Sequence, residues 1–336
     1  MSALRNGKTL LFPNRPVIAG WASTVGKKEA EGPLADWFDL KMNDSHFGET
    51  TWEKAESRMQ RMTLGSLLKK TGRKTGDVDV VFSGDLLNQC IGSTFALRAT
   101  GLPVLGLYGA CSTMAEALLL SAAAVNADYC TRAVAMTSSH FASSERQYRF
   151  PLGYGGQRTP TAQWTVTGCG AALVAKEGAG PVITAATPGA IADKGIRDAN
   201  NMGAAMAFAA WQTIRTHLDG IGLGPEAFDA IVTGDLGWLG HQIVAELFAR
   251  EGVRLEGRYF DCGMMIYDRE RQDVHCGGSG CGCSAAVLCS KLLGEMKRGN
   301  WKRILFCGTG ALLSPVSVQQ KESIPAICHA VQIECQ

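Results

Sequence analysis

The chain has 336 residues, of which 46% are hydrophobic and 19% are charged, as in an ordinary globular protein. Lys and Arg number 33 against 31 Asp and Glu, so the small net charge gives no reason to expect a nucleic-acid-binding protein. No apolar run approaches about eighteen residues and the N-terminus lacks a signal-like stretch, so we expect neither a membrane span nor secretion.

The first half of the chain alternates between strand-like and helix-like patterns. We expect strands at residues 15–23, 78–84, 103–108 and 132–139, and helices at 52–70, 86–100 and 112–125. The stretch 163–178 is predicted to form two strands that pair with each other around Gly168 and Gly170.

The second half repeats this pattern. Strands are expected at 180–191, 228–235, 257–263, 302–314 and 326–334, and helices at 202–218, 240–250 and 284–297. The segment "FDAIVTGD" closely matches "VDVVFSGD" in the first half, which indicates two copies of one unit. The break near 178–181 predicts halves at 1–180 and 181–336, in an α/β fold with mixed, mostly parallel sheets.

Cys111 lies between a predicted strand and a predicted helix, in "GLYGACSTM". Ligands of such sheets bind beyond the carboxyl ends of strands, and a helix N-terminus favours a thiolate. A catalytic or ligand-contacting cysteine and a buried structural thiol fit this position equally well. Most of the twelve cysteines have no obvious pairing and are expected to be reduced.

Three of the six histidines are candidates for a functional role: His140, His241 and His275. His140 ends a strand that opens toward the same edge as Cys111. His275 begins "HCGGSGCGCS", whose cysteine spacing matches no common zinc site, so we expect a tight turn that approaches a ligand and no bound metal.

Arginine and aromatic residues gather in residues 143–164, which include Arg149, Tyr154 and Arg158. Guanidinium groups bind carboxylates with two parallel hydrogen bonds and stack on rings, so this stretch suits a small planar anion. Solvated surface arginines are the alternative. The densest basic cluster, residues 69–74, is predicted to be a solvated helix end, with contact to anionic lipid headgroups as the alternative.

Several motifs together resemble one family across the whole chain. They are "FSGDLLNQC", "LGLYGACSTM", "SSHFASSERQYRFPLGYGGQRTPTAQWTVTGCGA", "TGDLG", "DCGMMIYD" and "GGSGCGCSA". The duplicated unit with a cysteine at a helix start resembles the thiolase and β-ketoacyl synthase superfamily. The motifs more closely resemble the stage V sporulation protein AD family of spore-forming bacteria.

The resemblance implies a thiolase-like five-layer αβαβα fold and a homodimer formed through first-half strands. It also implies a protein that binds dipicolinic acid, pyridine-2,6-dicarboxylate, during its uptake into the developing spore. Family members act with membrane-embedded stage V sporulation A proteins. The implied location is the spore inner membrane, at its periphery and through those partners, after synthesis in the cytoplasm.

The sequence departs from the catalytic superfamily where two further groups should serve the cysteine. One place offers Asp235 instead of a histidine, and the other offers Gly278 and Ser279 instead of an asparagine or histidine. A carboxylate repels a developing oxyanion, so we expect acyl transfer to be lost.

Two hypotheses follow for the site. In the first, the chain binds dipicolinate, free or as its calcium chelate, without catalysis or a cofactor, and Trp238 is a further candidate wall of the site. The predicted ligand-contacting residues are Cys111, His140, Arg149, Tyr154, Arg158, Asp235, His275 and Ser279. In the second, Cys111 is the nucleophile of an acyltransferase, with His241 or His275 as its base. A scaffold for the membrane partners is a third possibility.

Overall fold

The computed structural model describes residues 4–148, 157–255 and 257–336, and its strands form two sets with the same order. The first set consists of β3 (Val17–Val25), β5 (Val80–Gly84), β6 (Val104–Leu107), β7 (Arg132–Ser139) and β9 (Gly168–Ala175). The second set consists of β10 (Val182–Thr187), β11 (Ala230–Thr233), β12 (Tyr259–Asp261), β14 (Arg303–Ala311) and β15 (Ala326–Glu334). The spatial orders are β3-β9-β7-β5-β6 and β10-β15-β14-β11-β12, so corresponding strands take the same places in both sets.

The sheets are mixed, and the direction of pairing follows position within each set. The outer pairs β7–β5 and β5–β6 are parallel, as are β14–β11 and β11–β12. The inner pairs with β9 and β15 are antiparallel. The two sets join where Val17 of β3 pairs with Val182 of β10. The short strands β1 (Arg5–Asn6), β2 (Thr9–Leu11) and β4 (Leu40–Lys41) extend this sheet.

The predicted hairpin at 163–178 is wrong. Its first strand, β8 (Trp164–Thr165), pairs in parallel with β13 (Gly278–Ser279) of the second half and not with β9. β9 pairs instead with β3 on one side and with β7 on the other. This small separate sheet therefore places the end of the arginine-rich stretch, residues 143–164, against the glycine-rich turn, residues 275–284.

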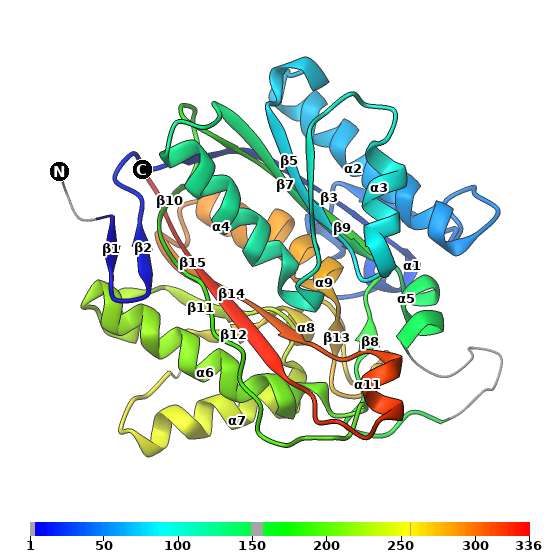
Figure 1. Ribbon diagram of the computed structural model, residues 1–336, viewed down its shortest axis with the longest axis vertical. Helices are drawn as coiled ribbons and strands as arrows, with labels where there is room; N and C mark the ends of the chain where they lie inside the picture. Colours follow the sequence, from blue (N-terminus) through cyan, green and yellow to red (C-terminus); the bar gives the residue numbers. More distant parts are fainter. Residues whose placement is uncertain (1–3, 149–156, 256) are drawn as a thin grey trace.

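Helices cover and separate the sheets, as Figure 1 shows. They are α1 (Lys27–Ala30), α2 (Trp52–Thr71), α3 (Ile91–Leu97), α4 (Thr113–Asn126), α5 (Phe141–Tyr148), α6 (Met202–Ile221), α7 (Gly237–Arg250), α8 (Cys262–Met265), α9 (Cys281–Val287), α10 (Leu293–Lys297) and α11 (Pro315–Gln319). A wide turn at Leu288–Leu292 joins α9 to α10, so the helix predicted at 284–297 begins earlier and is interrupted. The helix predicted at 86–100 is confined to α3 and one preceding turn.

Three large hydrophobic cores show that the layers number five. One core lies between α2 and α3 and the first sheet, and another between α6 and α7 and the second sheet. The central core surrounds α4 and α9, and α4 packs on β5 and β7 and also on β14 and β15. Small residues allow this close packing, since a Cβ on Gly170 of β9 would lie 2.1 Å from the carbonyl oxygen of Ala285 in α9.

Candidate functional site

Cys111 lies in a tight helical turn directly before α4. Ala110 has a φ of +51°, which is uncommon for a residue with a side chain, and it turns the chain from β6 into the helix. The Oγ1 of Thr113 donates to the carbonyl oxygen of Ala110 at 2.6 Å and fixes this turn. Cys111 is only 6% exposed, so its thiol lies inside the protein.

The carboxyl group of Asp235 lies beside Cys111 at the carboxyl end of β11. Its Oδ2 accepts from the Oγ of Ser279 at 3.1 Å and the backbone N–H of Gly280 at 2.9 Å, while Thr309 donates to Oδ1 at 2.7 Å. Ser279 Oγ lies 4.0 Å from the Sγ of Cys111. The structure thus brings Cys111, Asp235 and Ser279 together from both halves of the sequence.

This cluster keeps the thiol neutral. Burial and then the neighbouring charge of Asp235 raise the pKa of Cys111 well above its usual value. Burial also raises the pKa of Asp235, to about 6, although the hydrogen bonds that it accepts from Cys111, Gly280 and Thr309 oppose that shift. At neutral pH the carboxylate is therefore mostly ionised, and it disfavours a thiolate beside it.

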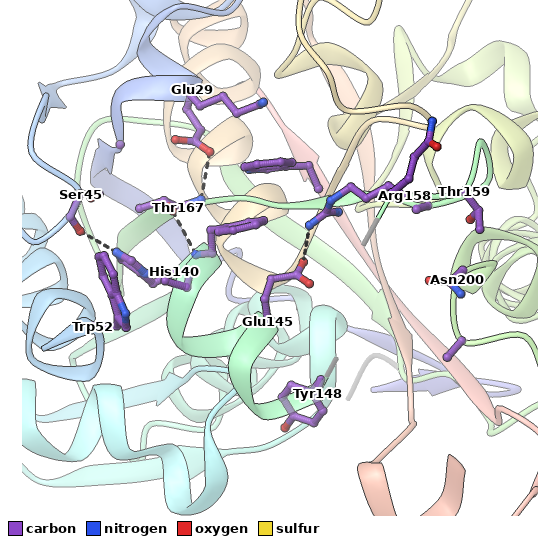
Figure 2. A pocket seen from close by; sticks show the side chains of 18 of the residues that line it. Glu29, Ser45, Trp52, His140, Glu145, Tyr148, Arg158, Thr159, Thr167 and Asn200 are labelled. Carbon is purple, nitrogen blue, oxygen red and sulfur yellow. Dashed lines mark hydrogen bonds and ion pairs between the residues drawn. The ribbon is translucent and has the colours of Figure 1, made fainter. Parts of the chain in front are cut away.

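The protein also has a large groove of about 1460 Å³. Figure 2 shows side chains that line it. The described residues that line it come from both halves and include Lys28, Glu29, Ser45, Trp52, His140, Phe141, Glu145, Tyr148, Arg158, Trp164, Arg197, Asn200 and Val318. Cys111 is not among the lining residues, but Tyr148 lines the groove and also packs against Cys111, Leu86 and Cys281. The groove and the cysteine cluster are therefore neighbours that meet at Tyr148.

Arg158 is held firmly in the groove wall. Its guanidinium lies 4.6 Å from the ring centroid of Trp164 and 5.3 Å from that of Phe141, whose rings stack at 4.1 Å. One guanidinium nitrogen donates to the carbonyl oxygen of Gln163 at 2.7 Å, and the other lies 3.4 Å from Glu145 (Figure 2). These contacts fix the direction of the planar cation and leave its side chain 20% exposed.

Lys28 adds a second cation to the same wall. Its Nζ lies 3.8 Å from the centroid of the Trp164 ring. Burial lowers the pKa of Lys28, and the nearby charge of Arg158 lowers it further, whereas the charges of Asp273 and Glu29 oppose the shift. A bound anion would relieve the repulsion between these two cations.

His140 is a neutral member of the groove wall. The N–H of Ala142 donates to Nδ1 at 3.2 Å, so the proton sits on Nε2, which donates to the carbonyl oxygen of Ser45 at 2.7 Å. Burial lowers the pKa of His140, and its ring lies 5.7 Å from that of Trp52. This end of the groove therefore offers flat uncharged surface and not a positive charge.

The other predicted site residues lie elsewhere. His275 is half-buried in a turn, 3.3 Å from Asp273, and no contact joins it to Cys111 among the described residues. His241 of α7 stacks on Tyr259 at 4.1 Å, and its Nε2 lies 3.3 Å from the carbonyl oxygen of that residue. Trp238 is 44% exposed, and the guanidinium of Arg269 lies 5.5 Å from its ring centroid. Arg149 and Tyr154 lie outside the described residues.

Three residues of the groove wall were not predicted from the sequence: Lys28, Trp164 and Trp52. Lys28 follows the carboxyl end of β3, so the rule that placed Cys111 and His140 at this edge could have found it. Trp164 was assigned to a hairpin, and only the pairing of β8 with β13 turns it into the groove wall. Trp52 starts α2, a position that carries no recognisable signal.

Similarity to known proteins extends over nearly the whole chain. The family model for stage V sporulation protein AD (SpoVAD) matches residues 6–334. The stage V sporulation protein AD of Bacillus subtilis (strain 168) is 39% identical over 329 residues, covering 98% of this chain and 97% of that protein.

Solved structures of condensing enzymes share the fold at low sequence identity. The 3-oxoacyl-[acyl-carrier-protein] synthase III from Aquifex aeolicus VF5 is 12% identical with a TM-score of 0.57, covering 95% of this chain and 99% of that chain. Human mitochondrial 3-ketoacyl-CoA thiolase is 11% identical with a TM-score of 0.58, covering 96% and 99%. The thiolase-like fold expected from the resemblance is confirmed.

Among the described residues, no cluster of three or more His, Cys, Asp or Glu side chains has the arrangement of a metal site. None of the helices in this part combines the length and the apolar character that crossing a bilayer requires. The match over residues 6–334 and the 39% identity show that the chain is a member of the stage V sporulation protein AD family.

Proposed function

We propose that the groove binds dipicolinate, free or as its calcium chelate, and that the protein takes part in uptake of this molecule into the developing spore. The observation that carries the proposal is the pair of cations, Lys28 and Arg158, that both contact the Trp164 ring. Dipicolinate is a flat ring with two carboxylates. Fixed cations suit its carboxylates, and the ring of Trp52, which also lines the groove, suits its face.

Binding is tested by titration calorimetry of the purified protein with dipicolinate. Lys28→Ala and Arg158→Ala should each weaken binding by about tenfold or more, because each removes a charge-assisted contact from a partly desolvated wall. Arg146→Ala is the matched control, since Arg146 belongs to the same arginine-rich stretch but pairs with Glu53 outside the groove. Equal affinity in all three variants would remove the proposed site.

Catalysis is not part of the proposed function. An acyltransferase needs Cys111 as a thiolate beside a group that accepts its proton, whereas burial and Asp235 favour the neutral thiol. The neighbouring polar groups are already engaged, because Ser279, Gly280 and Thr309 all donate to Asp235. The acyltransferase alternative retains one supporting observation, which is the position of Cys111 at the start of α4.

Asp235→Asn should make Cys111 react faster with iodoacetamide at about pH 8, by roughly tenfold for each unit by which its pKa falls. The physical reason is the loss of the carboxylate charge beside the thiol. Mass spectrometry of the Cys111 peptide measures the rate, and Cys130, which is partly exposed, is the internal reference. An acyl adduct on Cys111 of the unchanged protein after incubation with acetyl-coenzyme A would instead support the acyltransferase.

We further propose that the protein forms a homodimer through the edge of its first sheet. β6 is the last strand of that sheet, and one side of it is unpaired among the described residues. Apolar side chains are exposed along this edge: Phe95 is 41% exposed, Val104 38%, Leu105 53% and Tyr108 51%. An exposed apolar edge strand pairs readily with a second copy.

Membrane association in this proposal is indirect. The proposed partners are the membrane-embedded stage V sporulation A proteins, which would hold the protein at the periphery of the spore inner membrane after its synthesis in the cytoplasm. Support for this part comes from membership of the family.

A further inference from the structure

Two half-buried tryptophans, Trp21 of β3 and Trp37 of the loop beside it, have Lys and Arg side chains close to their rings. Trp37 is contacted by Lys291 and Arg298, which are 4.3 Å and 3.9 Å from its ring centroid. The ring rests on Gly294 of α10, where a Cβ would lie 2.5 Å from the Trp37 ring. Lys297 lies 6.0 Å from the ring centroid of Trp21. Both indoles are half-buried, so each presents one part to the core and another to solvent.

The basic end of α2 adjoins these rings. Lys70 forms an ion pair with Asp39 at 2.8 Å, and Asp39 follows Trp37 by two residues. Thr71 packs on the side of β3 that Gly20 faces, because a Cβ on Gly20 would be 2.3 Å from the Cγ2 of Thr71. Trp21 is the next residue of the strand, so it faces the other side of β3, toward Lys297. The Lys70–Asp39 ion pair connects the end of α2 to the loop that carries Trp37. We call Trp21, Trp37, residues 69–74 and residues 291–298 the basic tryptophan face.

Positive charge on this face exceeds the negative charge. Two of the nearby acidic groups have partners, since Asp39 pairs with Lys70 and Glu295 pairs with Lys291 at 2.5 Å, whereas the exposed Asp36 beside Trp37 has no ion pair among the described residues. Lys69, Arg73, Lys74, Lys297 and Arg298 are exposed, and within the described part of the chain no ion pair neutralises them. The rings orient some of these cations without removing their charge.

Indole rings beside Lys and Arg are the combination that the headgroup region of an anionic bilayer favours. The ring sits at the boundary between water and acyl chains, and the cations are attracted to lipid phosphates. Each Lys or Arg held near such a surface contributes to binding, and the attraction is lost beyond a Debye length. A bare basic cluster would serve nucleic acid as well, but the two half-buried indoles favour the lipid surface.

We propose that the basic tryptophan face binds anionic phospholipid headgroups directly. This goes beyond the proposed function, in which partner proteins alone hold the chain at a membrane. Residues 69–74 precede the amino end of β5, whereas His140 of the groove follows the carboxyl end of β7, which runs parallel to β5. The end of α2 and the groove thus lie beyond opposite ends of the strands of the first sheet. Lipid contact at the end of α2 therefore leaves the groove open.

The test is flotation of the whole protein with vesicles, without dipicolinate. We expect it to float with phosphatidylcholine vesicles that contain about 30% phosphatidylglycerol, to remain unbound with pure phosphatidylcholine, and to be released by about 0.5 M NaCl. Lys297→Glu with Arg298→Glu should weaken binding by about tenfold or more. Arg250→Glu with Arg254→Glu makes the same change of net charge near the end of α7, away from the face, and should leave binding within about twofold.

Three results would overturn the proposal. One is absence of binding to the phosphatidylglycerol vesicles. Another is equal loss of binding in both double variants, which would mean that net charge alone is responsible. The third is binding to duplex DNA with no binding to vesicles, which would assign the face to nucleic acid. Dipicolinate affinity of the variants is measured separately, so failure here leaves the groove proposal untouched.

Discussion

Unfolding should become easier as the pH rises from about 5 to about 8, because of a carboxyl group buried under the groove wall. Glu56 of α2 is fully buried, and burial together with the nearby charge of Asp85 raises its pKa to about 8. Ser138 and Ser143 donate to its two oxygens, each at 2.8 Å. Ser143 belongs to α5, which also forms part of the groove, so this carboxyl supports the site from below.

Stability falls with rising pH because the pKa of Glu56 is higher in the folded protein than in the unfolded chain. The folded state holds the Glu56 proton up to about pH 8, whereas the unfolded chain releases it near 4.5. The stabilisation is therefore complete below 4.5 and is lost as the pH rises through this window, at about 1.4 kcal/mol per pH unit. Asp85, which accepts from the backbone and side chain of Ser93, repels the charged form and opposes ionisation.

Denaturant unfolding at several pH values measures this slope. Glu56→Gln removes one titrating group and should make the slope shallower, while Asp235 and other buried carboxyls with raised pKa values keep the rest of it. Glu53→Gln, one turn earlier in α2, should keep most of the slope, because the charge of Glu53 is the smallest of the causes that raise the pKa of Glu56. Slopes are compared instead of absolute stabilities, since the Glu56→Gln substitution also changes the hydrogen bonds to the two serines. Parallel slopes for the unchanged protein and the Glu56 variant would show that Glu56 does not hold this proton.

Leu105→Lys should convert the proposed dimer into monomers. A dimer across β6 would place Leu105 near its counterpart, and burying a lysine there would cost several kcal/mol without a partner charge. Analytical ultracentrifugation should find twice the 35.8 kDa chain mass for the unchanged protein and the single chain mass for the variant. Ile191→Lys is the control, because Ile191 is 65% exposed in a loop that is not part of this edge. A monomeric unchanged protein, or a Leu105 variant that stays dimeric, would contradict the interface.

The repeating pattern made most of the fold predictable. Runs such as "VDVVFSG" and "FDAIVTGD" carry their own strand signal, and the two copies support each other. Pairing across the halves carries no such local signal, which is why the union of β8 with β13 was missed. Both strands have only two residues, and their partners are more than one hundred positions apart in sequence.

The candidate site, like the fold, could be predicted from the sequence only in part. Cys111, Asp235 and Ser279 could be placed together because the resemblance to thiolase-like enzymes puts the groups that serve the cysteine at these positions. The role of His140 could not be predicted, since its neutral state depends on burial and on the carbonyl of Ser45, a residue of a distant loop. Lys28 is similar, because only the folded chain brings its charge beside Arg158 and Trp164.

The central helix α4 has a consequence for how the chain can be divided. One side of it packs on β5 and β7 and the other on β14 and β15, and a Cβ on Gly308 of β14 would lie 2.6 Å from Ala115 of α4. Neither half can cover this apolar helix alone, so a ribosome that has made only the first half holds a chain with an exposed core. Folding of the cysteine turn must wait for translation of β14 and β15, near the end of synthesis.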